Sequence, residues 1–455
     1  MNMSVILHLG LGSFHRAHQA VYLQNLLDKG FKDWKLAGAN IRGDMQPIEA
    51  ALISQKGMYH VETVTPTGER HYQEIHAIQD IIPWDAALSG VVDYGARAEV
   101  KIISFTVTEA GYYLTPQHGL DLNFPDLVSD LEKGTHLTIY GALSAILNRR
   151  RLQGSGKVTL LSCDNLRSNG ERFHSGFTEF LTRRGDDELL GWLATHTSTP
   201  CAMVDRITPR PSPEIAQRVK AACGVEDKCP VMAEDFIQWV IEDHFIAGRP
   251  AWEQVGAELV SSVLPYEEAK IRLLNAPHAI IAWAGTLQGL RYIHEGVQDE
   301  RIRSFSYDYV TNDVLPVLEP SPINLRAYRD KVLERFSNAY ILDTNQRVAA
   351  DGYSKIPGWI TPTIRERLAR GEPIDSIAII PALFFLFLQR WSKGVLPFVY
   401  QDQAMDEKSV REMLASSAPL DVFCKDHVLW GALAGDARLS AAIQAAYDRA
   451  LTWLG

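Results

Sequence analysis

The sequence has few cysteines and lacks long apolar runs. Its five cysteines, an odd number without C-x-x-C spacing, argue against a disulfide framework and a structural zinc site and favour a reducing compartment. The longest apolar stretch, residues 377–388, is interrupted by Pro381 and is shorter than the roughly 20 residues that a bilayer requires. We therefore expect a buried core helix at this position, in a cytoplasmic protein without a membrane segment.

Basic clusters and a targeting segment are also missing. The formal net charge is −10, and neither basic blocks nor basic amphipathic helices occur, so nucleic acid and anionic membranes are not expected partners. Met1 leads directly into the apolar residues 5–7 without a basic region or a cleavage site, which predicts no targeting peptide. No coiled-coil pattern is visible, and we expect a monomer.

The N-terminal residues carry a glycine turn between two regular patterns. A buried strand pattern at residues 4–9 is followed by G-x-G-x-x-H and then by a helical pattern. Strand, turn and helix in this order predict the first unit of a Rossmann-like dinucleotide-binding domain, although an ordinary tight turn is the alternative and His15 replaces the third glycine. The expected pyrophosphate contacts are Gly10, Gly12, Ser13 and Phe14.

The second predicted strand, residues 35–41, bears on the choice of cofactor. It carries no acid for the adenosine ribose, and the nearest is Asp44, just beyond Arg42. If Asp44 holds the ribose diol the cofactor is NAD, and if Arg42 meets a 2′-phosphate it is NADP. We favour NAD, with exposure of either residue in a loop as the alternative.

Two further strand patterns end in polar clusters. Residues 100–107 lead to Glu109, and residues 157–162 lead to Asn165. Open α/β sheets bind ligands at the carboxyl ends of their strands, which makes both residues candidates for the active site. Glu109 is either an acid facing the crevice or a loop carboxylate. Asn165 either donates its amide N–H to a developing oxyanion or forms an Asx turn.

Strand patterns give way to helical ones along the chain. Residues 59–64 and 70–75 alternate like a hairpin, whereas helical periods dominate after about residue 212. We predict an α/β protein with a Rossmann-like NAD-binding domain, residues 1–265, and a mainly helical substrate domain, residues 266–455.

An apolar helical run in the second predicted domain contains Lys270, Asn275 and His278. At about 100° per residue, Lys270, Leu274 and His278 form one row, and Pro277 kinks the helix or begins a second one. A desolvated lysine loses its proton easily and can serve as a base. The alternative is a solvated helix face. Downstream, Arg347 and Lys355 either hold substrate hydroxyls or cofactor phosphate, or are exposed basic residues.

Taken in order, these motifs resemble the polyol-specific long-chain dehydrogenases, the mannitol dehydrogenase family, over nearly the whole chain. The motifs that carry the resemblance are Gly10-x-Gly12-x-Phe14-His15-Arg16-Ala17-His18-Gln19, Thr106-x-Thr108-Glu109-x-Gly111-Tyr112, Ser162-Cys163-Asp164-Asn165, Val204-Asp205-Arg206-Ile207-x-Pro209 and Lys270-x4-Asn275-x2-His278. One departure is Tyr353, where the family pattern implies a small residue, and it bears on the pocket's outer contacts.

The resemblance implies a zinc-independent, NAD-dependent oxidation of a secondary alcohol. It implies Lys270 as the general base, Asn165 with Asn275 as the oxyanion pair, and His278 as the residue that orients the substrate. The other implied site residues are Glu267 for proton passage to solvent, Glu109 as a second acid, and Asp205, Arg347 and Lys355 along the pocket.

The substrate implied by the resemblance is a polyol. The opening motif and the short chain are most similar to family members that oxidise D-arabinitol to D-xylulose, and oxidation of D-mannitol to D-fructose is the first alternative. Reduction of a hexuronate is less favoured because no dedicated cationic clamp is visible. A protein that binds NAD without turnover is the alternative from another class.

Overall fold

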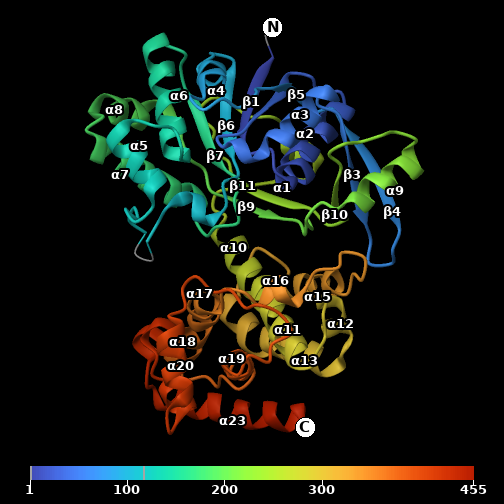
Figure 1. The fold of residues 1–455 in the computed structure, drawn as a ribbon, viewed down its shortest axis with the longest axis vertical. Coiled ribbons are helices and arrows are strands. Elements are labelled where there is room, and N and C mark those ends of the chain that lie inside the picture. The colour runs from blue at the N-terminus through green and yellow to red at the C-terminus, as the bar shows by residue number, and fades with distance from the viewer. Residues whose placement is uncertain (1–2, 116–117) are drawn as a thin grey trace. The chain divides into compact units, whose positions relative to one another are not determined.

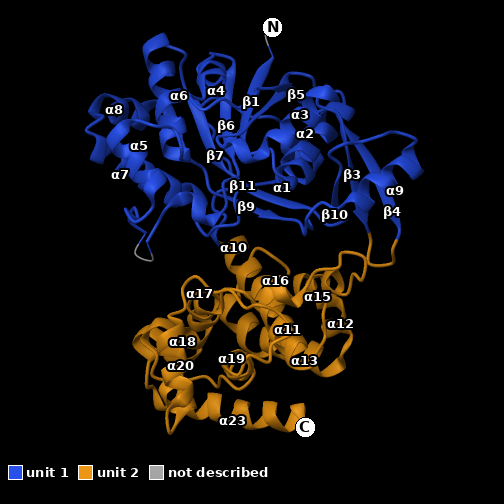
Figure 2. Ribbon diagram, viewed as in Figure 1, with its two compact units in different colours: residues 1–64, 69–264 blue, residues 65–68, 265–455 orange. Residues whose placement is uncertain are grey.

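The computed structural model describes residues 3–115 and 118–455. The chain divides into two compact units (Figure 2). The first contains the residues up to Val64 together with residues 69–264, and the second contains residues 65–68 and 265–455. The tip of a hairpin, residues 65–68, is thus grouped with the second unit.

A six-stranded parallel sheet forms the centre of the described part of the first unit (Figure 1). Its strands, in spatial order, are β5 Ile78–Ile81, β2 Trp34–Ala39, β1 Ser4–Leu9, β6 Val100–Phe105, β7 Val158–Ser162 and β8 Thr197–Ser198. In β1, Val5 and Leu7 pack into one apolar core and Ile6 packs into another. A parallel sheet covered on both faces reads as continuous apolar runs, which is the pattern that the sequence shows.

The predicted α/β fold, with a Rossmann-like sheet in the N-terminal part and a helical C-terminal part, is confirmed. The helices of the first unit are α1 Ser13–Ala17, α2 Gln19–Asp28, α3 Gln46–Ser54, α4 Ser89–Gly95, α5 Pro125–Lys133, α6 Ile139–Gln153, α7 Asn169–Arg184, α8 Asp187–His196 and α9 Pro213–Cys223. Helices α4, α6, α7 and α8 supply the core on the Leu7 face, and α2 contributes to the core that contains Ile6.

Two small sheets complete the strands of the first unit. Strands β3 Tyr59–Val64 and β4 Arg70–Ile75 pair antiparallel, which confirms the predicted hairpin, and β10 Val231–Glu234 joins β3. Strand β11 Gln238–Glu242 pairs with β9 Ala202–Asp205 and β12 Glu258–Val260. The expectation that strands end near residue 212 is therefore wrong, because these strands of three to five residues are too short to show a period.

The regular elements in the described part of the second unit are all helices, and the first of them, α10 Leu264–Lys270, begins at the last residue of the first unit. The helices that follow are α11 Ala276–Leu287, α12 Ile293–Gln298, α13 Glu300–Asp308, α14 Leu315–Leu318, α15 Leu325–Phe336, α16 Asn345–Ala349, α17 Gly352–Lys355, α18 Thr361–Ala369, α19 Ile379–Ser392, α20 Glu407–Ala415, α21 Pro419–Phe423, α22 His427–Trp430 and α23 Ala437–Leu454.

Helices α11 and α19 form the centre of the second unit. Residues 379–388 of α19 are all buried, and its Phe384 ring lies 4.7 Å from that of Trp283 in α11. The predicted core helix is confirmed, with a later start than the apolar run. No helix in the described part of the chain combines the length and hydropathy needed to cross a membrane.

Aromatic packing on the Leu7 face of the sheet generates a stability prediction. Phe173 is fully buried, and its ring lies 4.8 Å from Phe105 and 5.5 Å from Phe177. Phe173→Ala should lower the free energy of unfolding by about 3–5 kcal/mol, because it removes buried area and leaves a cavity. Phe31→Ala, at a residue that is 39 % exposed, should change it by only about 0.5 kcal/mol. Urea denaturation of the full chain measures both changes. Equal losses of unfolding free energy in the two variants would contradict the placement of Phe173 in the core.

Candidate active site

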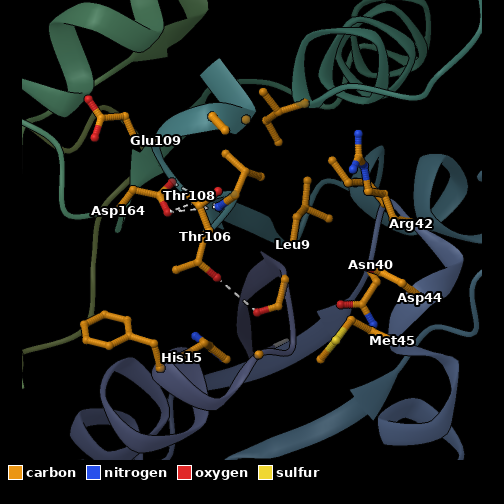
Figure 3. Close-up of a pocket in the computed structure, with 18 of the residues that line it drawn as sticks. Leu9, His15, Asn40, Arg42, Asp44, Met45, Thr106, Thr108, Glu109 and Asp164 are labelled. Atoms are coloured by element: carbon orange, nitrogen blue, oxygen red, sulfur yellow. Dashed lines mark hydrogen bonds between the residues drawn. The ribbon is translucent and has the colours of Figure 1, made fainter. Parts of the chain in front are cut away.

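The first unit contains a cavity of about 850 Å³ at the carboxyl ends of its central strands (Figure 3). Its lining follows four strands: Gly10 to His15 after β1, Asn40 to Met45 after β2, Thr106 to Gly111 after β6, and Cys163 to Asn165 after β7. This is the edge at which open α/β sheets bind their ligands. The cavity brings together seven predicted residues: Gly10, Gly12, Ser13, Phe14, Asp44, Glu109 and Asn165.

The glycine turn after β1 is shaped by a close approach of backbones. Gly10 has a φ of +121°, and a Cβ at this position would lie 2.5 Å from the carbonyl oxygen of Thr106, so only glycine fits. A Cβ on Gly12 would meet no atom within 4 Å. The protein therefore does not fill the space over Gly12, which suits the close approach of a dinucleotide to the backbone.

The residues after β2 that line the cavity include a buried asparagine and an exposed arginine. Asn40 is buried; its side chain accepts from the Leu11 N–H at 2.8 Å and donates to Glu49 at 2.6 Å, which ties the glycine turn to β2. Arg42 donates to Asp126 at 2.7 Å and to the Tyr113 hydroxyl at 2.9 Å.

Asp164 connects the ends of β6 and β7. Its carboxylate accepts the backbone N–H groups of Val107 and Thr108, with shortest distances of 3.0 and 2.8 Å (Figure 3). It also accepts the Tyr112 hydroxyl at 3.0 Å. Burial raises the pKa of Asp164 to about 6, although these hydrogen bonds oppose the shift. Thr108 is held at a φ of +63°, and Glu109, which lines the cavity, follows it on an exposed turn.

Asp205 lies at the end of β9 and is buried, but it is not among the residues that line this cavity. Asp164 belongs to one of the family motifs, but the sequence alone assigns it no role at the site. Its position between a strand end and Asn165 is the signal that could have identified it.

In the part of the chain that the structure describes, no group of three or more His, Cys, Asp or Glu side chains is placed to hold a metal.

The Lys270 helix contains a π-helical turn, residues 271–275. The Ala276 N–H bonds to the carbonyl of Ile271, five residues earlier, and Pro277 lies in the first turn of α11. The predicted row at 100° per residue is therefore wrong here. Ordinary α-helical geometry would place Lys270 and Asn275 about 140° apart, whereas an i→i+5 turn brings them towards one side.

Both Glu267 and Lys270 are buried in α10. The π turn is fixed by Arg272, which donates to Glu366 at 2.9 and 3.0 Å and to Glu268 at 2.9 Å.

Asp343 joins two predicted residues that lie far apart in the sequence. Its Oδ2 lies 3.1 Å from Nε2 of His278, an ion-pair distance rather than an aligned hydrogen bond, and Arg347 donates to both carboxylate oxygens at 2.7 and 2.6 Å. Although burial opposes it, the charges of His278 and Arg347 hold the pKa of Asp343 well below its usual range. Sequence reasoning missed Asp343. Its signal is the i, i+4 spacing to Arg347, with Asp343 two residues before the start of α16.

Lys355 lies near this group, at the end of α17. Its ammonium donates to the carbonyl of Val348 at 2.6 Å and lies 5.3 Å from the centre of the Trp359 ring. Burial lowers the pKa of Lys355 to about 8, and the charge of Arg347 adds to the shift. Tyr353, the departure from the family pattern, is buried and donates to Asp426 at 3.2 Å.

A parallel sheet with a glycine turn after β1 and a cavity at its strand ends defines a dinucleotide-binding protein of the Rossmann type. Residues 4–254 match the model of the mannitol dehydrogenase Rossmann domain, and residues 262–451 match that of the mannitol dehydrogenase C-terminal domain. The chain belongs to the mannitol dehydrogenase family, which confirms the resemblance and the expectation of a polyol dehydrogenase.

Individual relatives match the chain over almost its full length. It is 56 % identical to D-arabinitol 4-dehydrogenase of Ralstonia nicotianae, covering 99 % of this chain and 97 % of that one. It is 51 % identical to D-arabinitol 4-dehydrogenase of Klebsiella pneumoniae, covering 96 % of each. The structure of Pseudomonas fluorescens mannitol 2-dehydrogenase in ternary complex with NAD and D-mannitol matches with a TM-score of 0.86 at 32 % identity, covering 100 % of this chain and 94 % of that one.

The Asp343 contacts generate a prediction about His278. Burial lowers the pKa of the His278 ring, and the charge of Asp343 opposes that shift. Asp343→Asn removes the opposing charge, so the pKa of His278 should fall further. The imidazole C2–H resonance, assigned with His278→Gln and followed by NMR against pH, measures it.

Asp330→Asn is the matched control for this substitution. Asp330 also pairs with an arginine of the second unit, Arg329 at 2.8 Å, but its side chain is 60 % exposed. This substitution should leave the titration of His278 unchanged. A pKa that is unchanged or raised in Asp343→Asn would contradict the proposed contact.

Proposed function

We propose that the protein is a D-arabinitol 4-dehydrogenase that oxidises D-arabinitol to D-xylulose with NAD⁺. The observation that carries this proposal is the similarity over nearly the full chain to two enzymes of that name, at 56 % and 51 % identity. The cavity at the strand ends supports it, because its glycine turn leaves the space that a dinucleotide requires.

NAD rather than NADP is proposed from the residues after β2. Asp44 lines the cavity and supplies the acid that holds an adenosine ribose diol. Arg42, the candidate for a 2′-phosphate, already donates to Asp126 and Tyr113. The structurally similar mannitol 2-dehydrogenase is a complex with NAD, which agrees with this choice.

When bound, NAD⁺ accepts the hydride that leaves the reacting carbon. Lys270, in its neutral form, takes the proton of the reacting hydroxyl. The amide N–H groups of Asn165 and Asn275 donate to the oxygen as negative charge develops on it. His278 orients the substrate.

The remaining predicted residues act around this step. Glu267, buried one helical turn before Lys270, passes the proton towards solvent. Glu109 supplies a second acid. In the second unit, Arg347 and Lys355 lie near one another and donate to substrate hydroxyls.

The substrate is tested by NADH formation with D-arabinitol and D-mannitol in parallel, in the presence of a chelator. We expect a higher kcat/KM with D-arabinitol and D-xylulose as the product. We also expect no loss of activity with chelator, because a lysine rather than a zinc-bound group removes the hydroxyl proton. A preference for D-mannitol would instead identify the protein as a mannitol 2-dehydrogenase, which oxidises D-mannitol to D-fructose. Binding of NADH without turnover of either polyol would contradict the proposal.

The role of Lys270 is tested by Lys270→Ala. Loss of a general base should lower kcat by about 10²–10⁴-fold while NADH binding to the first unit is retained. In the wild-type enzyme, polyol oxidation should rise with pH, since an ammonium has no lone pair. Lys408→Ala, at a side chain that is 86 % exposed, is the control and should keep wild-type turnover. Near-wild-type kcat in Lys270→Ala would show that another group is the base.

A further inference from the structure

A second, much smaller cavity lies in the interior of the first unit. Its volume is about 10 Å³, at the lower end of the size that holds one water molecule. Apolar residues of β1, β2, β7 and α2 form part of its wall, and five polar side chains also line it: Ser104 of β6, His15 of α1, Gln19 of α2, Trp239 of β11, and Trp252 of a short 3₁₀ turn. The Ser104 hydroxyl already has a partner, Nδ1 of His8 at 2.8 Å. His15 also lines the large cavity.

The other four polar side chains share an unusual property. Among the described residues, the following buried atoms have no hydrogen-bond partner in the protein: both ring nitrogens of His15, Oε1 of Gln19 and Nε1 of Trp239 and Trp252. Each of these side chains is at most 6 % exposed. Burying a polar atom without a partner is unfavourable, so four side chains with such atoms around one small cavity call for a shared partner.

We propose that this cavity binds one ordered water molecule that is coordinated by His15, Gln19, Trp239 and Trp252. The chemistry of the four groups matches the valence of water. An indole N–H can only donate, so the two tryptophans occupy the two lone pairs of the water. The amide oxygen of Gln19 can only accept, and it takes one of the two protons. The second proton goes to an unprotonated ring nitrogen of His15.

The proposal requires His15 to be neutral, and its surroundings agree. Burial, followed by the neighbouring His8, lowers the pKa of His15 well below its ordinary value, and the opposing effect of Gln19 is smaller. His8 lies stacked on His15 with ring centres 3.4 Å apart, and burial lowers the pKa of His8 to about 3. Two stacked, uncharged imidazoles avoid the repulsion that two protonated rings would suffer.

The amide of Gln19 is oriented by a second contact. Its Nε2 lies 3.0 Å from Nδ1 of His18, which leaves Oε1 as the atom available to the cavity. A neutral His15 carries one ring proton, so the nitrogen that accepts from the water leaves the other as the N–H. The water therefore sets the tautomer of the residue that replaces the third glycine of the dinucleotide motif.

The water would also join three parts of the first unit. His15 and Gln19 belong to the helices that follow the glycine turn, whereas Trp239 belongs to a small sheet and Trp252 to the turn near it. The two indole rings already pack together, with centres 4.7 Å apart. A shared water adds a directional link between this aromatic pair and the start of the dinucleotide-binding helices.

A crystal structure of the full chain at a resolution that shows ordered solvent tests the proposal directly. We expect one water peak within about 2.7–3.2 Å of the four named side chains. A cavity without density would overturn the proposal. Direct hydrogen bonds from the indoles to Gln19, with the gap closed, would also overturn it.

NMR of the full chain with ¹⁵N-labelled tryptophan provides a test in solution. The indole N–H signals of Trp239 and Trp252, assigned with Trp→Phe variants, should show rotating-frame dipolar cross-peaks to water. Trp283 and Trp430 are the matched controls, because their buried indoles donate to the carbonyls of Ala349 and Phe423, and they should show none. Absence of cross-peaks from both Trp239 and Trp252 would contradict the site.

Substitution of the acceptor completes the test. Gln19→Leu removes one partner of the water and should weaken both cross-peaks. Gln24→Leu, in the same helix, breaks contacts to Asp28 and to the backbone of His76 and should leave them unchanged. Unchanged cross-peaks in Gln19→Leu would place the water elsewhere and overturn the assignment.

Discussion

The close approach of the turn after β1 to the end of β6 is the contact on which the cavity of the first unit depends. At Gly10 the backbones come so near that a Cβ would collide with Thr106. The carbonyl of Gly10 lies 3.1 Å from the hydroxyl of Thr106 and 3.0 Å from Nε2 of His8, so the contact is hydrogen-bonded as well as close. The cavity lies beside this contact, where the chain passes from the ends of β1 and β6 into the loops that line it.

Much of the first unit could be predicted from local sequence features. The parallel strands are apolar runs because helices cover both faces of their sheet, and the glycine turn follows the first of them directly. Strands β10, β11 and β12 could not be predicted in the same way. They are short, and their place depends on partners that are distant in the sequence, such as β3 for β10.

The candidate site shows the same division. Residues at strand ends, such as Glu109 and Asn165, could be predicted because the carboxyl edge of the sheet collects them. Asp164 and Asp343 act by accepting hydrogen bonds or by pairing with cations, and their partners are known only once the chain is folded. The π-helical turn was missed because its apolar residues are equally compatible with an α-helix.

That π-helical turn has a consequence for how the chain tolerates changes in length. A π turn holds one residue more than an α turn, so losing one apolar residue from 271–274 would return the helix to α geometry with both flanks in place. Lys270 and Asn275 would then be four residues apart and still share a face. The same deletion after Asn275 would turn His278 by about 100° away from them. A one-residue deletion before Asn275 therefore keeps the polar side chains of this helix on one face, whereas the same deletion after Asn275 separates His278 from the other two.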